Sequence, residues 1–184
     1  MVVTINAADA TELYTYGAEK VLTVSNDSLS TFNAKEYASV IEQAAMKENA
    51  TIVVVDSSIN GLYLSPLVAV ALEADYASNT VSAPSSISPF TVKRKAFSNK
   101  AFSNTVISAE KKVIGLAKNS FGIHENPVSG VLESFDVQVA VSGVKSEKVE
   151  RVTRKVTIAD ADTIVSAGRG MKGPENWGMI EELA

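Results

Sequence analysis

The sequence predicts an α/β fold with a doubly wound, mostly parallel β-sheet and an added β-hairpin region. In the first two thirds of the 184 residues, short β-rich runs alternate with stretches of helical periodicity, a pattern typical of that class. After residue 88 the chain changes to β-rich runs without helices between them. Hydrophobic residues make up 46% and charged residues 21% of the sequence, so a chain of this length has enough apolar side chains for a core.

Two β-rich runs at the N-terminus flank a short helical stretch. Residues 2–5 and 20–25 are rich in valine and threonine, which favour strands. Between them, residues 9–16 predict a short helix, and Gly17 is placed to end it because glycine adopts left-handed backbone angles readily. The chain therefore begins as a strand–helix–strand unit.

A longer helix and a buried strand follow. Asn33 stands three residues before Glu36, which is typical of a helix start, and this helix is predicted to run to about residue 49. Residues 51–55 form the most continuous apolar run in the chain and predict a central strand buried on both faces. Ser65-Pro66 predicts one more helix start, because serine caps helices and proline needs no partner at the first helical position.

The pentamer Lys-Ala-Phe-Ser-Asn occurs twice in succession, at residues 95–99 and 100–104. One continuous strand would place Phe97 and Phe102 on opposite faces. The preferred interpretation is a hairpin with its turn near residues 98–100, which would let both aromatic rings face one core. The other strands predicted in this part of the chain are 90–97, 104–109, 113–116 and 136–141.

Two segments in the second half read as connections. Residues 119–134 contain Gly122, Pro127, Gly130 and His124, and predict a surface loop in which the histidine is a surface side chain rather than a base. Residues 145–155 mix both charge signs and predict a solvated strand or linker.

The residue types exclude several classes of function. The chain has no cysteine, so disulfides, thiolate catalysis and thiolate metal sites are excluded, and its one histidine rules out a histidine-rich metal site. The net charge of −4 argues against nucleic-acid binding. No apolar run approaches the roughly 20 residues of a membrane helix, and the N-terminus shows no secretory signal.

One motif carries chemistry. Residues 168–173 spell G-x-G-x-x-G, between a strand predicted at 163–166 and a helix predicted from Pro174. In that context glycines let the backbone approach a diphosphate, and Arg169 and Lys172 would add positive charge. A proline directly after the third glycine favours a tight structural turn instead. The acidic ribose partner, expected about 20 residues later, would lie beyond Ala184.

The remaining candidates favour ordinary structural roles. Asp160 and Asp162 would share a face of an extended segment, but no further metal ligand or partner acid stands near them, so a solvated edge is expected. Trp177 is expected to pack rather than to stack on a ligand, and Asn60-Gly61 to form a plain turn rather than an anion site. No catalytic residue and no metal ligand is predicted.

The C-terminal segment carries a family resemblance. Residues 163–170 (TIVSAGRG), with Pro174-Glu-Asn176 and residues 180–184 (IEELA), resemble the "VVSGGRG…ENF…LA" block of the electron transfer flavoprotein alpha subunit. Earlier segments follow the order of that family's N-terminal domain: residues 16–22 (YGAEKVL), Gly61 with Ser65-Pro66, and residues 90–94 (FTVKR) with Phe97. Departures are Ala167, where the family has a glycine, and Asn99-Lys100, where it has Gly-Asn.

The resemblance implies a domain organisation and a cofactor. It implies a three-layer, adenine nucleotide alpha hydrolase-like domain over residues 1–156, and the opening strand, turn and helix of an FAD-binding domain over residues 157–184. Gly168, Arg169 and Gly170 would be the FAD contacts present, with the main FAD residues beyond Ala184. The family's first strand and helix would precede Val2.

The resemblance also implies a function and partners. The full-length relative would pair with a beta subunit, take electrons from flavin dehydrogenases, as in fatty acid β-oxidation, and pass them to a quinone reductase. This part would be structural, would contact the beta subunit, would not retain FAD and would self-associate through its uncovered surface. The location would be the bacterial cytoplasm or the mitochondrial matrix.

A second function stays open from the residues alone: a small adenine-nucleotide-binding α/β module. It would hold phosphate at strand ends near Asn6 and residues 56–58, or at the Gly168 turn, because folds of this kind bind ligands outside the carboxyl ends of their parallel strands.

Overall fold

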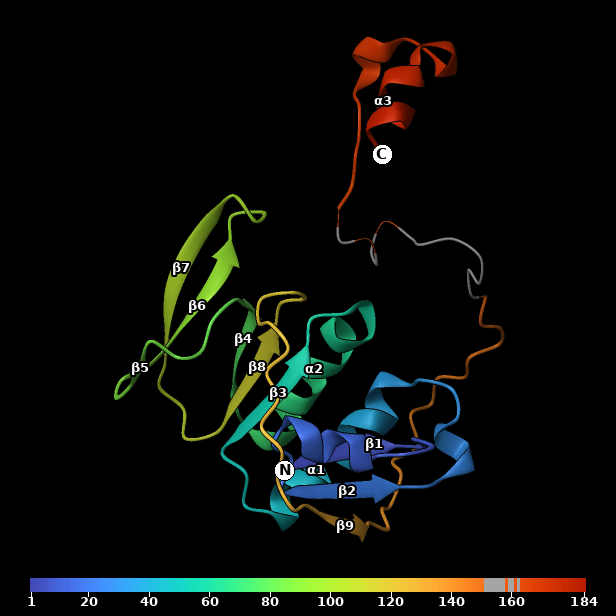
Figure 1. Cartoon of the computed structure of the whole chain (residues 1–184). Helices are drawn as coiled ribbons and strands as arrows, with labels where there is room; N and C mark the ends of the chain where they lie inside the picture. Colours follow the sequence, from blue (N-terminus) through green and yellow to red (C-terminus); the bar gives the residue numbers. More distant parts are fainter. Residues whose placement is uncertain (151–157, 159–160, 162) are drawn as a thin grey trace. The chain divides into compact units, whose positions relative to one another are not determined.

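The computed structural model describes residues 1–150, 158, 161 and 163–184. These residues form two compact units, Met1–Ser146 and Glu147–Ala184, hereafter unit 1 and unit 2 (Figure 1). The expected domain boundary at residues 156 and 157 lies outside the described residues and stays a prediction, as do Asp160 and Asp162 and the last part of the charged linker.

Unit 1 contains two sheets. In the first, β1, β2 and β9 lie side by side in that order and are all parallel. In the second the order is β3-β8-β4-β6-β5, with β7 paired to β6; β3, β8 and β4 are parallel and the rest antiparallel. The α/β class with mostly parallel strands is confirmed. The strands are β1 (Val2–Ile5), β2 (Lys20–Val24), β3 (Ile52–Asp56), β4 (Asp75–Thr80), β5 (Ser86–Ile87), β6 (Phe90–Ala96), β7 (Ala101–Ile107), β8 (Lys112–Leu116) and β9 (Val131–Ser134).

The first half of unit 1 follows the sequence closely. The 3₁₀ helix η1 (Thr11–Tyr16) ends at Gly17, whose φ of 89° lies in the left-handed region. Helix α1 (Ala34–Lys47) begins after Asn33, whose side-chain oxygen accepts hydrogen bonds from the N–H groups of Lys35 and Glu36. A second 3₁₀ helix, η2, covers Asp27–Leu29.

The start of the next helix was predicted wrongly. Helix α2 runs over Ile59–Leu72, so it begins well before Ser65-Pro66, and Pro66 lies inside it. The cap is Ser58, whose Oγ accepts the N–H of Gly61 at 3.1 Å. Ser65 instead donates its hydroxyl to the Gly61 carbonyl within the helix, at 2.7 Å. Gly61 is in the first turn of this helix, not in a plain turn, and a Cβ there would overlap the Asp56 carbonyl.

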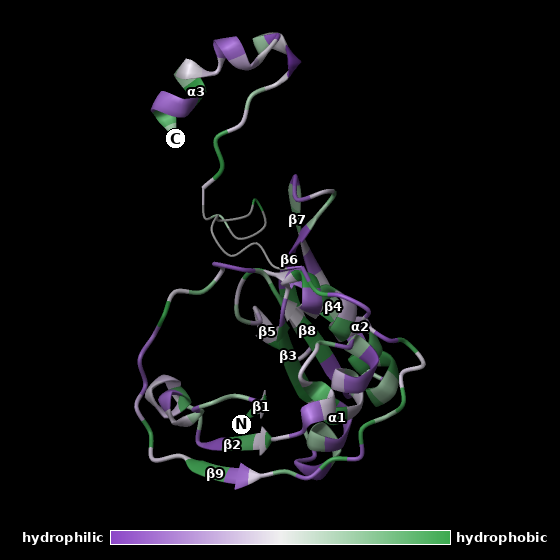
Figure 2. Ribbon diagram, turned by 90° about the vertical axis from the view of Figure 1, so that its right-hand side faces the viewer, coloured by the Kyte–Doolittle hydropathy of each residue, from purple (hydrophilic) through white to green (hydrophobic). Residues whose placement is uncertain are grey.

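The main core lies where α1 and α2 pack against each other and against β3, β4 and β8 (Figure 2). Its centre is formed by small and β-branched side chains, of which Val68 and Val113 are fully buried. A second cluster joins Val24, Leu29 and Val40 beneath the first sheet. Helix α1 contributes to both clusters and therefore links the two sheets of unit 1.

The repeated pentamer forms the predicted hairpin, with one correction. Strands β6 and β7 pair in register, and Phe97, Ser98 and Asn99 make the turn with left-handed backbone angles. Phe97 and Phe102 do not face a core, since 79% and 62% of their surfaces are exposed. The rings lie against lysines instead, with Lys93 Nζ 4.6 Å from the Phe102 ring centre and Lys100 Nζ 5.9 Å from that of Phe97.

Four other predictions were wrong, and for residues 119–134 and 136–141 the reason is that tertiary contacts outweigh the local pattern. The predicted loop 119–134 contains strand β9, which pairs with β2. Residues 136–141 are not a strand, although Val137 and Val139 pack against the second cluster. In unit 2, residues 163–166 are not a strand, and the helix expected from Pro174 is a 3₁₀ turn η4 (Pro174–Asn176) followed by α3 (Gly178–Leu183).

The position of strand β3 in its sheet also differs from the prediction. Its apolar run predicts a strand with a neighbour on each side, yet β3 pairs with β8 alone and lies at the edge of its sheet. As a result Ile52 and Val54 are 45% and 59% exposed. The main-chain edge of β3 that faces away from β8 is unpaired among the described residues.

Candidate functional site

The glycine motif lies in unit 2 and forms a tight turn. Gly168 precedes the 3₁₀ helix η3 (Arg169–Met171), and Lys172 leaves it with a φ of 63°. The side chain of Asn176 donates a hydrogen bond to the Met171 carbonyl at 2.9 Å, which closes the turn. A Cβ at Gly168 or Gly170 would meet nothing within 4 Å, so the backbone there is open to approach.

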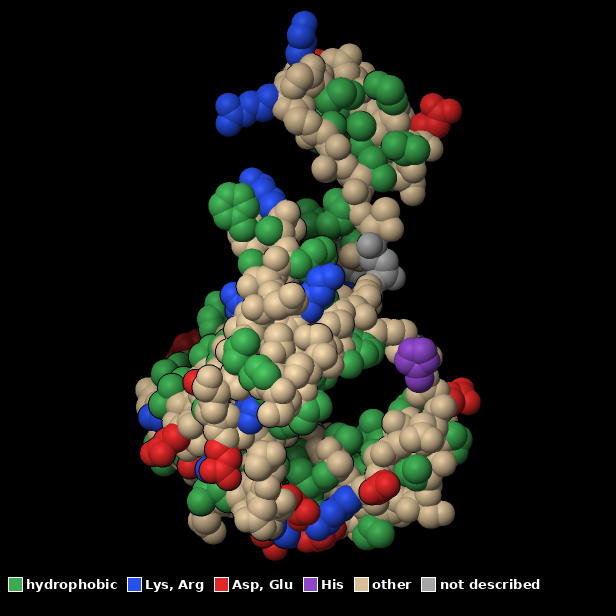
Figure 3. Space-filling model, turned by 90° about the vertical axis from the view of Figure 1, so that its left-hand side faces the viewer, with side chains coloured by type: hydrophobic (Ala, Val, Ile, Leu, Met, Phe, Trp, Pro, Cys, Tyr) green, Lys and Arg blue, Asp and Glu red, His purple; other side chains and the backbone are tan. Residues whose placement is uncertain are grey.

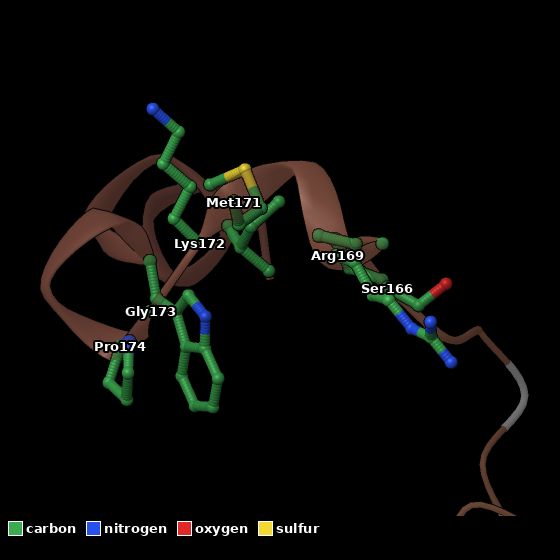
Figure 4. A pocket seen from close by; sticks show the side chains of 11 residues that line it. Ser166, Arg169, Met171, Lys172, Gly173 and Pro174 are labelled. Carbon is green, nitrogen blue, oxygen red and sulfur yellow. The ribbon is translucent and has the colours of Figure 1, made fainter.

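A hollow of about 450 Å³ lies beside this turn (Figure 4). Its walls are mainly apolar, with contributions from Val165, Met171, Pro174, Trp177 and Ile180. Arg169 lies next to Ser166, whereas Lys172 points to the other side of the turn (Figure 4). The two cations therefore do not converge on one point, as a diphosphate site made by both would require.

The residues described in unit 2 do not by themselves fit a flavin. FAD needs donors and charges placed around its isoalloxazine ring. Every described residue from 163 to 184 is exposed or only partly buried. Helix α3 has six residues, too short to supply an anion site of its own. An open glycine backbone beside one arginine suits a phosphate oxygen, but no described group surrounds a ring.

The strand ends of unit 1 form the second candidate. Asn6 follows β1, and its side-chain amide is engaged on both sides by the Asn26 backbone, at 2.9 Å each. Ser58 is engaged as the cap of α2, and Asp56 would place a carboxylate against any phosphate there. Ser57 Oγ is buried without a hydrogen-bond partner among the described residues. Two of the side chains expected to hold a nucleotide are therefore already occupied.

The other residues considered in the sequence analysis have no described contact that indicates a catalytic or binding role. His124 lies in an exposed loop, and Figure 3 shows the histidine side chain at the surface. Trp177 lines the hollow of unit 2 and is 47% exposed. Within the described ranges, no three histidine or carboxylate side chains lie close enough to hold a metal. Within the same ranges, no helix has the length and apolar character to cross a membrane.

An ion cluster in unit 1 was not predicted from the sequence. Lys20 Nζ on β2 lies 2.6 Å from Glu48 Oε1 and 2.9 Å from Glu133 Oε2 on β9. Lys47, at the end of α1, also pairs with Glu133. Hydrogen bonds from Lys47 and Lys20 lower the pKa of Glu133, and those to Glu48 and Glu133 raise the pKa of Lys20. The cluster joins β2, β9 and α1, which is a structural role.

Comparison with known proteins identifies the family. The family model described as "Electron transfer flavoprotein domain" matches residues 2–157. An electron transfer flavoprotein subunit alpha of Bacillus subtilis (strain 168) is 31% identical over 179 residues, which is 95% of this chain and 55% of that protein. The corresponding protein of Clostridium acetobutylicum is 24% identical over 94% of this chain and 54% of its own length. The subunit LctC of a lactate dehydrogenase (NAD(+),ferredoxin) from Acetobacterium woodii is 26% identical, covering 95% of this chain and 43% of LctC.

These matches cover nearly the whole of this chain but only part of each relative. The α/β architecture of unit 1 agrees with them. The chain belongs to the electron transfer flavoprotein domain family, and the relatives from Bacillus subtilis and Clostridium acetobutylicum are named alpha subunits of that flavoprotein. It spans about half the length of the curated relatives it matches.

Proposed function

We propose that residues 1–156 are the N-terminal domain of an electron transfer flavoprotein alpha subunit, and that residues 157–184 open its FAD-binding domain. The observation that carries this is the family match over residues 2–157, which stops just before the glycine turn. The turn itself, at residues 168–173, resembles the block that the family places after that domain.

The whole protein would carry electrons rather than catalyse a reaction. It would pair with a beta subunit, accept electrons from flavin dehydrogenases and deliver them to a quinone reductase, in the bacterial cytoplasm or the mitochondrial matrix. Unit 1 would be a structural domain that contacts the beta subunit. The apolar side chains exposed on β3 would favour self-association at high concentration.

FAD would belong to the whole subunit. When bound, it supplies the electron chemistry. Of the residues described here, Gly168, Arg169 and Gly170 would lie against it, the glycines by leaving their backbone open and the arginine by placing a cation near a phosphate oxygen. Since nothing described surrounds the ring, we expect this 184-residue chain to hold FAD weakly and to purify colourless.

Titration with oxidised FAD, followed by flavin fluorescence, tests the cofactor assignment. We expect quenching no stronger than roughly millimolar affinity would give, and Arg169→Ala should weaken it further, whereas Lys95→Ala on the hairpin should not change it. Stoichiometric capture of FAD at micromolar concentration would contradict the proposal. Calorimetry with ATP tests the nucleotide-binding alternative, which predicts micromolar binding of ATP and none of FAD.

A further inference from the structure

The far end of the β6–β7 hairpin protrudes from unit 1. The ladder between β6 and β4 reaches only to Arg94, and from Lys95 onward β6 pairs with β7 alone. Figure 1 shows the two strands extending beyond the rest of the second sheet. Residues 97–100, which form the turn, are all exposed. The hairpin therefore ends in a convex surface, made by residues 93–102 and hereafter called the hairpin tip.

Every charged side chain of the hairpin is positive. Residues 90–107 contain three lysines and one arginine but no aspartate or glutamate, although the whole chain has a net charge of −4. Arg94 is directed toward the body of the sheet, where it donates a hydrogen bond to Ser78 Oγ at 3.2 Å. The three lysines, Lys93, Lys95 and Lys100, belong to the hairpin tip. The tip is therefore a positive patch on a chain whose remainder is strongly negative.

Two phenylalanine rings lie among these lysines with most of their surface in solvent. Phe97 is 79% and Phe102 is 62% exposed. Lys95 lies directly opposite Phe102 in the strand register, and Lys93 shares its face of the hairpin because alternate residues of a strand point the same way. A phenyl ring has no polar group to interact with water, so exposure of both rings is unfavourable until an apolar phase covers them.

The shape and the charge of the hairpin tip favour a membrane surface over other anionic partners. A single-stranded nucleic acid needs a groove with open ring faces on which bases stack, whereas the tip is convex and a lysine lies over each ring. An acidic peptide would pair with the lysines but would leave the rings in water. A bilayer with anionic headgroups offers phosphates to the lysines and, just beneath them, acyl chains to the rings.

We propose that the hairpin tip docks reversibly on a bilayer that contains anionic phospholipid. Phe97 and Phe102 enter the boundary between the headgroups and the acyl chains, while Lys93, Lys95 and Lys100 contact lipid phosphates. The same surface repels the negative remainder of the chain, so the protein binds with its hairpin foremost. This proposal does not depend on the proposed electron-transfer function.

Flotation of the full chain with lipid vesicles tests the proposal. Vesicles of phosphatidylcholine with about 30% phosphatidylglycerol should carry the protein upward in a density gradient, whereas self-associated protein without vesicles sinks. Binding to phosphatidylcholine alone should be weaker by about tenfold or more, and high salt should weaken binding to the mixed vesicles. Free glycerol phosphate at the same phosphate concentration should not displace the protein, because it offers no apolar layer to the rings.

Matched variants tie vesicle binding to the hairpin tip. Lys100→Ala should weaken it by about fivefold because one cation is lost, and Phe97→Ala by about tenfold because one buried ring is lost. The controls are Lys35→Ala, at an exposed position of α1, and Val131→Ala, at an exposed position of β9. Each control should leave binding within about twofold. Circular dichroism shows whether the four variants fold.

A tryptophan at the hairpin tip reports whether the tip enters the lipid. In a chain whose own Trp177 is replaced by phenylalanine, the emission of Phe97→Trp should move to shorter wavelength when mixed vesicles are added. The emission of Val131→Trp, at the opposite end of unit 1, should not move (Figure 1). The proposal is overturned if the tip tryptophan does not respond, if the two hairpin variants float like the unsubstituted chain, or if phosphatidylcholine alone binds equally well. Tighter binding of oligothymidylate or polyglutamate to the hairpin tip would also overturn it.

Discussion

Single side chains decide where the helices of unit 1 begin and end. Asn33 and Ser58 supply the oxygen that the first N–H groups of α1 and α2 lack. At the other end of α2, Glu73 adopts a φ of 54°, in the left-handed region that glycine occupies without strain. Substitution of a single side chain at one of these positions should therefore change the free energy of unfolding of unit 1.

Ser58→Ala should destabilise unit 1 by about 1 kcal/mol, because it leaves the Gly61 N–H without its partner. Urea denaturation followed by circular dichroism measures the free energy of unfolding. Ser146→Ala, at an exposed position outside any helix or strand, is the control and should change it by less than about 0.5 kcal/mol. Equal effects of the two substitutions would mean that the cap contributes nothing.

Glu73→Gly should stabilise unit 1 by up to about 1 kcal/mol, because glycine adopts the left-handed conformation that glutamate holds under strain. Glu42→Gly, inside α1, should instead lower the free energy of unfolding by about 1 kcal/mol, because glycine is unfavourable within a helix. Thermal unfolding of both variants gives the comparison. A loss of stability at both positions would refute the argument from backbone angle.

Whether the structural role of a residue can be predicted from the sequence depends on how far along the chain its contacts lie. Gly17 and Asn33 were predicted correctly because each acts on the backbone next to it. Ser58 was missed because Ser65-Pro66 carries the same local signal, and only the hydrogen bond from Ser65 to Gly61 shows that it lies within the helix. For the glycine turn the sequence predicts the position but not that Arg169 and Lys172 point apart.

At the scale of elements, charges hold together segments that are distant in sequence. The cluster of Lys20, Lys47, Glu48 and Glu133 joins β2 and the end of α1 to β9. Its members are partly exposed, so salt should weaken their interactions. The lowered pKa of Glu133 and the raised pKa of Lys20 make the contribution of the cluster depend on pH.

Glu133→Gln should destabilise the protein at neutral pH, and the difference from the unsubstituted chain should vanish in acid. Because the pKa of Glu133 is lower in the folded state than its ordinary 4.5, its stabilisation is complete above 4.5 and is lost as the pH falls through the folded value. Urea unfolding at pH 7 and at pH 3 measures this. Ser146→Ala, which removes no carboxyl group, is the control and should change the free energy of unfolding equally little at the two pH values.

The elements themselves were predicted where a local pattern defines them. Strands β1, β2, β6 and β8 follow their β-rich runs, and the repeated pentamer does form a hairpin. Strand β9 was missed because its hydrogen bonds go to β2, more than a hundred residues earlier in the sequence. Residues 136–141 were wrongly predicted as a strand, because their apolar side chains pack on the core although their backbone pairs with no strand.

At the scale of the whole molecule, the main core of unit 1 lies where β8 meets α2, which in turn packs against α1. Val113 is fully buried there and belongs to the same cluster as Val68 and Leu72. The family match and the two compact units agree that most of the chain is one α/β domain. Sequence predicted that class, but it could not predict that β8 lies between β3 and β4.

Val113→Ala should lower the free energy of unfolding by about 2 kcal/mol, because it removes buried methyl groups and leaves a cavity. Val106→Ala, on the exposed face of β7, is the matched control and should change it by less than about 0.5 kcal/mol. Urea denaturation of the two variants decides the matter. If both cost the same, β8 is not a central element of the core.

The insertion of β8 between β3 and β4 has a consequence for biosynthesis. While the ribosome is making the chain, β3 and β4 emerge well before residue 112, and the strand that pairs with both of them, β8, is not yet present. The nascent chain must therefore keep a row of unpaired valines exposed during this interval, a state in which chaperones bind and aggregation begins. A released polypeptide that ends before Lys112 should be recovered with chaperone, and one that extends past Ser134 should not.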